Sequence, residues 1–197
     1  MVFKKGDITG FSGKLWPQYQ FEIQGFIDLL CSENVRSYLE IGCRYGDTWH
    51  AVGSALEQGS RLVGLDLPGA KSGFEHKGGH QDSGDYLELA ASDLRKQGQD
   101  AVVIIGNSHK RNTIETARAA GPYDAILIDG DHTAAGVNSD WDDYGPMGRI
   151  VAFHDISGNG KWALQIRPIF QLLAKTLRST TIIHDDLRRG IGVLWRS

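Results

Sequence analysis

Titratable side chains gather behind two short apolar segments in the second half of the sequence. One segment leads directly into Asp129, Asp131 and His132, and the other leads into His154 and Asp155. Carboxylates brought together in this way repel one another unless a cation or a proton joins them. Carboxylate oxygens with imidazole suit a divalent ion, Mg²⁺ or Mn²⁺ where the ligands are mainly oxygen and Zn²⁺ through histidine. A metal-free acid–base cluster, with Asp129 capping the sheet, stays open as the alternative.

A glycine-containing turn follows an earlier apolar segment and reads Glu40-Ile41-Gly42-Cys43-Arg44-Tyr45-Gly46. Gly42 allows a tight turn, and Gly46 lets a helix begin close to a ligand, with Asp47 expected as its N-cap. The N-terminus of that helix favours an anion. A dinucleotide-binding loop would also have glycine at position 44, so that bare backbone could approach a pyrophosphate. With Arg44 there, the spacing favours a smaller ligand that carries a carboxylate over NAD, and a merely tight turn is the alternative.

Two more segments end in groups that could hold a nucleoside. Asp66 lies 20 residues after Gly46, where a carboxylate can accept both hydroxyls of a ribose. Its alternative role is that of a turn or helix-cap residue. Asn107 and Ser108 follow the next apolar segment and offer small polar groups to an adenine edge. The order of these features along the chain is more informative than any one of them.

The segments that precede these groups must be strands, because they are short, apolar and β-branched. They alternate with segments of helical spacing, which predicts an α/β, Rossmann-like, doubly wound fold: a mainly parallel seven-stranded sheet with helices on both faces. Ligands bind beyond the carboxyl ends of such strands, where the residues above fall. The expected strands are Val35–Ile41, Arg61–Leu65, Ala101–Ile105, Ala125–Ile128, Ile150–Phe153, Thr180–His184 and Gly192–Trp195, the last two paired as a hairpin around Asp185–Gly190. The expected helices are Pro17–Cys31, Thr48–Glu57, Asp85–Gln97, Thr113–Ala120, Ala134–Tyr144 and Trp162–Leu177.

The length of 197 residues fits a single domain. We expect residues 1–33 to form an N-terminal helix or cap, residues 34–156 the cofactor-binding core, and residues 157–197 a closing helix and strands. This leaves little room for a separate substrate domain. Contacts to the substrate are therefore expected from Phe11–Tyr19, Pro68–Gly84 and Ser157–Trp162, and Pro68–Gly84 is long enough for a lid.

Composition and charge exclude several classes of protein. With 21 Lys+Arg against 24 Asp+Glu, the chain has no basic excess to neutralise a nucleic-acid backbone. Its longest apolar run has five residues, far short of the roughly 18–20 that span a bilayer. Residues 1–7 lack the apolar segment of a signal peptide, and two cysteines make a poor disulfide framework. We therefore expect a cytoplasmic protein with free thiols that binds neither nucleic acid nor membrane.

Taken together, the motifs resemble a known family. They are Glu40-Ile41-Gly42-x-x-x-Gly46, Asp66, Asn107-Ser108, Ile128-Asp129-Gly130-Asp131-His132 and Phe153-His154-Asp155. In this order they look like a class I S-adenosylmethionine (SAM)-dependent methyltransferase. The Asp-Gly-Asp-His and His-Asp motifs resemble more narrowly the methyltransferase 24 type, akin to macrocin-type sugar O-methyltransferases and more distantly to catechol O-methyltransferase. The resemblance covers residues 35–156.

The resemblance implies SAM as the cofactor and methyl transfer to a hydroxyl of a small molecule or glycan sugar. The expected cofactor-binding residues are Glu40, Gly42, Arg44, Tyr45, Gly46, Asp66, Asn107, Ser108 and Asp129. Similar metal-dependent enzymes hold a divalent ion, Mg²⁺ or another, through positions that match Asp129, His154 and Asp155. His154 is a departure, because an acid is commoner at its position. A homodimer is compatible with the resemblance.

Two residues compete as the catalytic base. In related sugar methyltransferases the second acid of Asp-Gly-Asp is the proposed base, which matches Asp131, and in catechol-type enzymes a lysine at the position of His132 serves. A neutral His132 would need only its usual pKa near 6.5, whereas Asp131 would need a neighbouring cation to acidify the hydroxyl first. The presence of a metal therefore decides which of the two residues is the base, and Asp131 is favoured over His132. The alternative for His132 is a ring that binds a carboxylate and orients the following helix.

Three other functions remain open at this point. A NAD-dependent oxidoreductase would use a similar sheet but is disfavoured by Arg44. A methyltransferase-like module could hold a nucleoside without turnover, although a retired site need not keep Asp129, Asp131 and His132 together. A metal-dependent hydrolase would need no pocket at Glu40–Gly46.

Overall fold

A seven-stranded sheet forms the centre of the computed structural model, which describes residues 17–67, 83–183 and 189–196. The strand order is β3-β2-β1-β4-β5-β7-β6. All neighbours run parallel except β7, which is antiparallel to both β5 and β6. The predicted doubly wound, mainly parallel sheet is thus confirmed. The strands are β1 (Ser37–Ile41), β2 (Arg61–Asp66), β3 (Asp100–Ile105), β4 (Tyr123–Ile128), β5 (Gly148–Phe153), β6 (Arg178–Ile182) and β7 (Ile191–Trp195).

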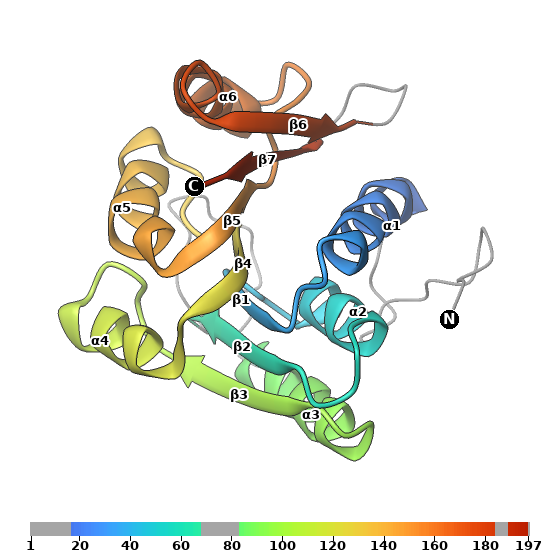
Figure 1. Ribbon diagram of the computed structural model, residues 1–197. Helices are drawn as coiled ribbons and strands as arrows, with labels where there is room; N and C mark the ends of the chain where they lie inside the picture. Colours follow the sequence, from blue (N-terminus) through green and yellow to red (C-terminus); the bar gives the residue numbers. More distant parts are fainter. Residues whose placement is uncertain (1–16, 68–82, 184–188, 197) are drawn as a thin grey trace.

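Six α-helices of the described residues cover the two faces of the sheet, α1, α2 and α3 on one side and α4, α5 and α6 on the other (Figure 1). None of these helices is long and apolar enough to cross a membrane. The helices are α1 (Pro17–Ser32), α2 (Asp47–Ala55), α3 (Ser83–Lys96), α4 (Arg111–Ala120), α5 (Ala134–Tyr144) and α6 (Lys161–Leu173), with one 3₁₀ turn, η1 (Gly145–Met147), before β5.

The central strands are buried on both faces, because their side chains alternate between two hydrophobic cores. On β1, Tyr38 packs in the core beneath α1, α2 and α3, and the next residue, Leu39, packs in the core beneath α4, α5 and α6. Leu127 and Ile126 of β4 divide in the same way. Continuous apolar segments in the sequence therefore correspond to strands without a solvent-facing side.

The start of α2 differs from the prediction. Asp47 was expected as the N-cap, but α2 begins at Asp47, and Gly46 occupies the cap position with φ of 79° and no side-chain cap hydrogen bond. A Cβ on Gly46 would lie only 3.1 Å from Leu87 and 3.2 Å from Ala90 of α3. Glycine is needed here both for the left-handed backbone and for the close helix packing. Asp47 lies in the first turn, where its negative charge interacts favourably with the positive end of the helix dipole.

The last helix is also shifted, since α6 spans Lys161–Leu173 rather than Trp162–Leu177. After Leu173 the amide groups of Lys175 and Thr176 donate to carbonyls three residues back, which tightens the chain out of the α-helix. Several predictions lie outside the described residues. They are the hairpin residues 184–188, positions 68–82 of the expected lid, residues 11–16 and the side chain of Tyr19.

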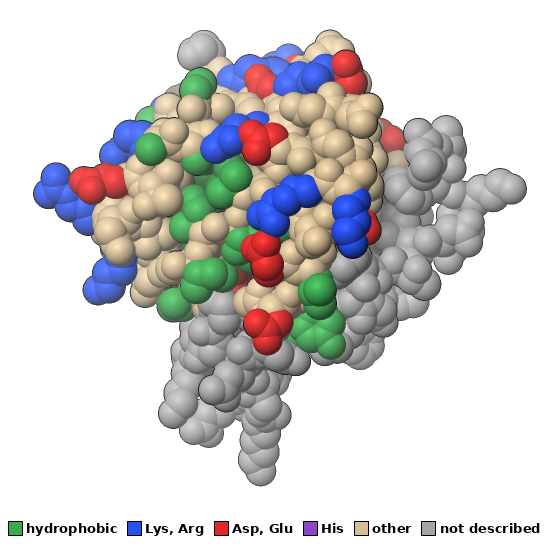
Figure 2. Space-filling model, turned by 90° about the horizontal axis from the view of Figure 1, so that it is seen from below, with side chains coloured by type: hydrophobic (Ala, Val, Ile, Leu, Met, Phe, Trp, Pro, Cys, Tyr) green, Lys and Arg blue, Asp and Glu red, His purple; other side chains and the backbone are tan. Residues whose placement is uncertain are grey.

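The side of the molecule that carries β3, α3 and α4 is seen from below in Figure 2, with basic and acidic side chains interspersed. Arg61 of β2 forms an ion pair with Asp100 of β3, and Arg95 forms one with Glu88 within α3. Arg95 Nε also donates to the carbonyl of Ala101 in β3, at 2.8 Å. β3 is an edge strand, and a charged side chain bound to its backbone disfavours pairing with another chain.

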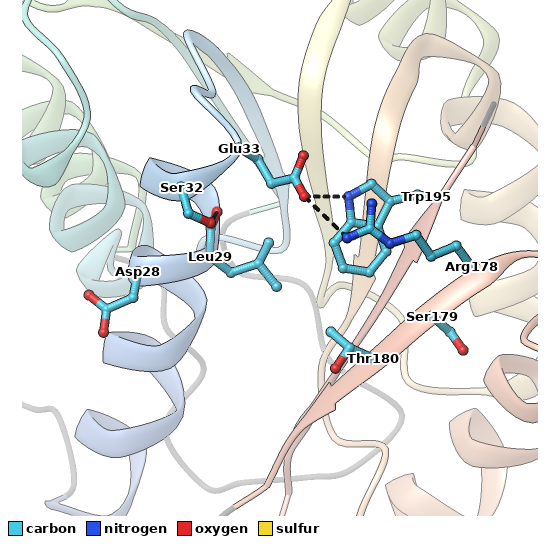
Figure 3. Close-up of a pocket in the computed structure, with 8 residues that line it drawn as sticks. All are labelled: Asp28, Leu29, Ser32, Glu33, Arg178, Ser179, Thr180 and Trp195. Atoms are coloured by element: carbon cyan, nitrogen blue, oxygen red, sulfur yellow. Dashed lines mark hydrogen bonds and ion pairs between the residues drawn. The ribbon is translucent and has the colours of Figure 1, made fainter.

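A cavity of about 620 Å³ lies at the opposite end of the sheet from the strand ends that carry the predicted site, between α1 and β6–β7 (Figure 3). Glu33 joins the elements around this cavity through polar contacts. Its carboxylate accepts from Trp195 Nε1 at 3.0 Å and lies 3.7 Å from Arg178 and 3.5 Å from Arg149. Arg178 also lies over the Trp195 ring, with its Cζ 4.1 Å from the ring centroid. Glu33 thus ties the end of α1 to β5, β6 and β7.

We expect Glu33→Ala to lower the free energy of unfolding by about 1–3 kcal/mol, because it leaves the partly buried indole N–H of Trp195 without its acceptor and removes the carboxylate that faces Arg178 and Arg149. Urea unfolding followed by circular dichroism measures the change. Glu57→Ala is the matched control, since Glu57 pairs with Arg36 but its side chain is 74% exposed, and it should shift stability by no more than about 0.5 kcal/mol. Equal effects of the two substitutions would contradict a structural role for Glu33.

Candidate active site

Four titratable side chains meet where β4 and β5 end. Asp129 directly follows β4, His154 and Asp155 directly follow β5, and His132 comes from the loop after Asp129. One ligand-capable atom from each of the four residues lies within 4.8 Å of all the others. The backbone positions them, because Asp129 N–H donates to Ile41 O at 2.9 Å and His154 N–H donates to Ile128 O at 3.2 Å. Each bond continues the strand pairing by one residue.

Both histidines face both carboxylates of this cluster. Nε2 of His132 lies 3.1 Å from Asp129 Oδ1 and 3.3 Å from Asp155 Oδ2. Nδ1 of His154 lies 3.0 Å from Asp129 Oδ1 and 3.7 Å from Asp155 Oδ1. We refer to Asp129, His132, His154 and Asp155 as the His–Asp cluster.

The charges of the His–Asp cluster stabilise one another. Burial by itself lowers the pKa of both histidines, but the facing carboxylates outweigh it and raise the pKa of His132 to about 10 and that of His154 to about 9. Burial by itself raises the pKa of Asp129 and of Asp155, but the two imidazoles outweigh it and hold both pKa values below the usual range. Two anions thus balance two cations when no ion is bound.

Asp131, the favoured base of the sequence analysis, lies outside the His–Asp cluster. Its side chain is exposed, and Oδ1 accepts from Thr133 N–H at 2.9 Å. Thr133 is the N-cap of α5 and accepts from Gly136 N–H at 3.0 Å. A Cβ on Gly136 would collide with the Asp131 carboxylate. The start of α5 therefore fixes Asp131 beside, rather than among, the four clustered side chains.

Glu22 of α1 is a member of the site that sequence reasoning missed. It is 2% exposed, Oε1 accepts from Gly190 N–H at 3.0 Å, and Oε2 lies 3.9 Å from His154 Nε2. Oε2 is buried and has no hydrogen-bond partner among the residues that the structure describes. Burial raises the pKa of Glu22, against the lowering effect of His154. Its position four residues before the buried Phe26 placed it on the apolar face of the helix, which was the available signal.

Arg189 and Trp162 also border the His–Asp cluster. Arg189 Nη1 lies 3.8 Å from Asp155 Oδ1. The Trp162 ring, in the first turn of α6, lies 5.1 Å from the His132 ring between centroids. The segments before β1 and after β5 therefore both reach the site, through Glu22 on one side and through Trp162 and Arg189 on the other.

The turn after β1 passes directly against the turn after β4. Gly42 has φ of 89°, and a Cβ there would collide with the carbonyl of Asp129. Arg44 has φ of 54°, so the position where a dinucleotide loop would have glycine is left-handed here although it holds arginine. Its backbone N–H donates to Asp66 Oδ1 at 3.0 Å, which joins the turn to the end of β2. Tyr45 packs edge-on to Tyr86 of α3, with centroids 5.5 Å apart.

Glu40 lies at the end of β1 and is 1% exposed. Its Oε2 accepts from the Tyr38 hydroxyl at 2.7 Å. Burial raises the pKa of Glu40 to about 8, with the Asp129 charge adding to the rise and the Tyr38 hydrogen bond opposing it. With this pKa, the Glu40 carboxyl group changes its charge close to neutral pH.

Asn107 and Ser108 form the turn after β3 and are held from two sides. Asn107 Oδ1 accepts from His109 N–H at 2.8 Å, and Ser108 O accepts from the Tyr144 hydroxyl at 2.8 Å. Asp140 of α5, which sequence reasoning also missed, is fully buried, and its Oδ1 lies 3.3 Å from His109 Nε2. Burial raises the pKa of Asp140 to about 6. This turn is thus anchored to α5 rather than left mobile in solvent.

The strand order, with β7 antiparallel, and the turns after β1, β2, β3 and β4 define a class I methyltransferase fold. Residues 39–156 match the family model described as methyltransferase domain, of the methyltransferase 24 type, and the chain belongs to this family. A search of curated protein sequences found no match.

Solved structures support the same fold. The O-methyltransferase from Bacillus cereus in complex with SAH is 15% identical, with a TM-score of 0.63 over 93% of this chain and 83% of that one. TomG from Streptomyces achromogenes, an O-methyltransferase involved in tomaymycin synthesis and solved with SAM, is 16% identical, with a TM-score of 0.62 over 89% and 79%. Cofactor-bound Rv0187 from MTB is 15% identical, with a TM-score of 0.63 over 92% and 81%.

The pKa of Glu40 predicts a pH dependence of stability. Because the folded-state pKa is about 8 and the unfolded value is near 4.5, the folded protein binds the proton more tightly between these values, and stability falls as pH rises. Between about pH 5 and pH 9 the free energy of unfolding should fall in both proteins. We expect the fall to be about 2–4 kcal/mol smaller in the isosteric variant Glu40→Gln than in the wild type. Urea unfolding across this range measures the difference. Identical slopes in the two proteins would contradict the assignment.

Proposed function

We propose that this protein transfers the methyl group of SAM to a hydroxyl oxygen of a small molecule or sugar. The observation that carries the proposal is the contact of Gly42 with Asp129, which sets a cofactor-type turn directly beside the His–Asp cluster. Membership of the methyltransferase domain family supports transfer of a methyl group. The similarity to O-methyltransferases solved with SAH and with SAM supports the cofactor and an oxygen acceptor.

The proposed cofactor pocket follows the strand ends from β1 to β4. Buried Glu40, in its ionised form, would balance the positive charge of the cofactor's methionine end. Asp66, whose Oδ1 already accepts from Arg44 N–H, would accept the ribose hydroxyls. The turn at Asn107 and Ser108 would border the adenine. The full proposed set is Glu40, Gly42, Arg44, Tyr45, Gly46, Asp66, Asn107, Ser108 and Asp129.

The proposed reaction is a direct displacement. The acceptor oxygen forms a bond to the methyl carbon while the bond from that carbon to sulfur breaks, and S-adenosylhomocysteine (SAH) leaves with the electron pair on sulfur. The hydroxyl proton passes to a carboxylate, for which we propose Asp131. His132 is the alternative base, but with no ion bound the facing carboxylates raise its pKa to about 10 and keep the ring protonated, which favours Asp131. Because the sulfonium is already activated, the protein mainly aligns the two reactants and lowers the effective pKa of the hydroxyl.

Asp129, His154 and Asp155 are the proposed holders of a divalent ion. Their donor atoms converge, and the buried Glu22 carboxylate, whose Oε2 lies 3.9 Å from His154 Nε2, supports a site that accepts additional positive charge. An ion bound there would act as a Lewis acid on the acceptor hydroxyl. Trp162, beside His132, and the segment Ser157–Trp162 are proposed to contact the acceptor.

The cofactor claim is tested by calorimetric titration with SAH, with NAD as the competing ligand. We expect micromolar binding of SAH and no binding of NAD. Gly42→Ala should weaken SAH binding by at least about tenfold, because its Cβ would displace the turn after β4 and strain a left-handed backbone. Gly160→Ala is the matched control, since φ is −68° there and a Cβ would meet nothing within 4 Å.

Other results of this titration point to other functions. Binding of NAD instead of SAH would favour an oxidoreductase. Binding of neither would remove the methyltransferase proposal and favour a hydrolase. SAH binding without turnover on any acceptor would favour a nucleoside-binding module.

The choice of base is tested with Asp131→Asn, which keeps the oxygen that accepts from Thr133 N–H. We expect kcat to fall by roughly 10²–10⁴-fold, while SAH affinity stays within a few-fold. Turnover is measured as SAH formation, with an acceptor found by screening phenols and sugars. If His132→Gln instead abolishes turnover and Asp131→Asn does not, the base is His132. Equal losses of turnover and SAH affinity in Asp131→Asn would show a folding role.

A further inference from the structure

We propose that all four side chains of the His–Asp cluster bind one metal ion, and that the ion is an imidazole-accepting transition metal such as Zn²⁺ or Co²⁺ rather than Mg²⁺. This inference rests on the metal assistance included in the proposed function and extends it in two respects. It makes His132 a fourth ligand rather than a base, and it makes Glu22 a positioning residue for His154.

His132 presents one defined nitrogen to the cluster. Its Nδ1 lies 2.9 Å from Gly130 O, and because a carbonyl can only accept, Nδ1 carries the proton. Nε2 then faces Asp129 and Asp155, at 3.1 and 3.3 Å. A second-nitrogen hydrogen bond to a backbone carbonyl is the usual arrangement of a metal-binding histidine, since it fixes both tautomer and ring orientation.

His154 has the complementary arrangement. Nδ1 faces Asp129 and Asp155, whereas Nε2 points toward Glu22 Oε2 at 3.9 Å. Glu22 is 2% exposed, and within the described part of the chain its Oε2 has no hydrogen-bond partner, which is costly for a buried carboxylate. A carboxylate behind the second nitrogen of a metal-binding histidine raises the basicity of the ligand. A cation bound to His154 would explain why the fold keeps the Glu22 carboxylate buried despite this cost.

The spacing and charge of the donors fit one ion. Ligands at about 2.0–2.2 Å from a common zinc ion lie less than about 4.4 Å apart. The four separations between histidine nitrogens and carboxylate oxygens, with both oxygens of Asp155 used, are 3.0, 3.1, 3.3 and 3.7 Å. One donor atom from each of the four residues lies within 4.8 Å of the others, so the set closes on one ion with a contraction of a few tenths of an ångström. Two carboxylates and two neutral imidazoles would neutralise a divalent cation. Mg²⁺ prefers an all-oxygen shell with retained waters, whereas imidazole suits zinc and the later transition metals. The donor set therefore selects against Mg²⁺.

The assignment also separates the two candidate bases. A His132 nitrogen committed to a metal cannot take up the acceptor proton. Asp131, exposed and held at the start of α5 outside the cluster, keeps its carboxylate for that task. The neighbouring motif residues would then have different functions, metal binding for His132 and proton transfer for Asp131.

The test is calorimetric titration of the full chain, freed of metal with EDTA, with ZnCl₂, CoCl₂ and MgCl₂ in turn and with no cofactor present. We expect one Zn²⁺ per chain, bound at least about a hundredfold more tightly than Mg²⁺. His132→Ala should weaken Zn²⁺ binding more than tenfold. Glu22→Gln, which keeps the oxygen that accepts from Gly190 N–H, should weaken it by roughly tenfold. His50→Ala is the control and should leave it unchanged, because His50 pairs with Asp93 between α2 and α3.

Three results would overturn the inference: Mg²⁺ binding as tight as Zn²⁺ binding, Zn²⁺ binding unchanged by His132→Ala, or no binding of any of the three ions. Circular dichroism confirms folding, and Glu22→Gln carries the test if His132→Ala does not fold. SAH titration of the same metal-free protein keeps the two proposals apart. If the protein binds SAH but no metal, the metal centre is ruled out and the methyltransferase proposal stands. If it binds metal but not SAH, the proposed function is ruled out and the metal centre stands.

Discussion

The junction of the turns after β1, β4 and β5 is the constraint on which the rest of the site depends. Two backbone hydrogen bonds, from Asp129 to Ile41 and from His154 to Ile128, carry the parallel pairing one residue past the strand ends. The functional side chains therefore leave the sheet from a rigid edge. Gly42 completes the junction, because only a residue without a Cβ fits against the Asp129 carbonyl. The proposed cofactor turn and the His–Asp cluster are consequently held in a fixed position relative to each other.

Electrostatic balance explains how so many charges can lie together at this edge. Each carboxylate of the His–Asp cluster faces imidazole nitrogens, and each imidazole faces carboxylates, so the costs of full or partial burial are offset locally. Replacing either histidine would leave two carboxylates facing one imidazole, and replacing either aspartate would leave two imidazoles facing one carboxylate. The same arrangement prepares the cluster for an ion, since a divalent cation can replace the two protons without changing the net charge.

The sequence was a good guide to the strands and to the residues directly after them. Apolar β-branched segments have few other structures open to them, and a parallel sheet fixes where their ends meet, so the meeting of Asp129, His132, His154 and Asp155 could be predicted. Glu22 and Asp140 could not. A single acid in a helix is normally solvated, and the partner of Glu22, Gly190, lies 168 residues away. The cap at Gly46 was missed because Asp47 has the better capping side chain, whereas packing against α3 decided the position.

The hydrogen bond between Glu22 and Gly190 has a consequence for how the site is made during translation. Synthesis runs from α1 to β7, so Glu22 leaves the ribosome long before Gly190, while the four clustered side chains emerge between them. A nascent chain that ends before Gly190 would hold every candidate ligand but would bury the Glu22 carboxylate without its N–H donor. The Glu22 side of the candidate site therefore gains its hydrogen-bond donor only after Gly190 has been synthesised.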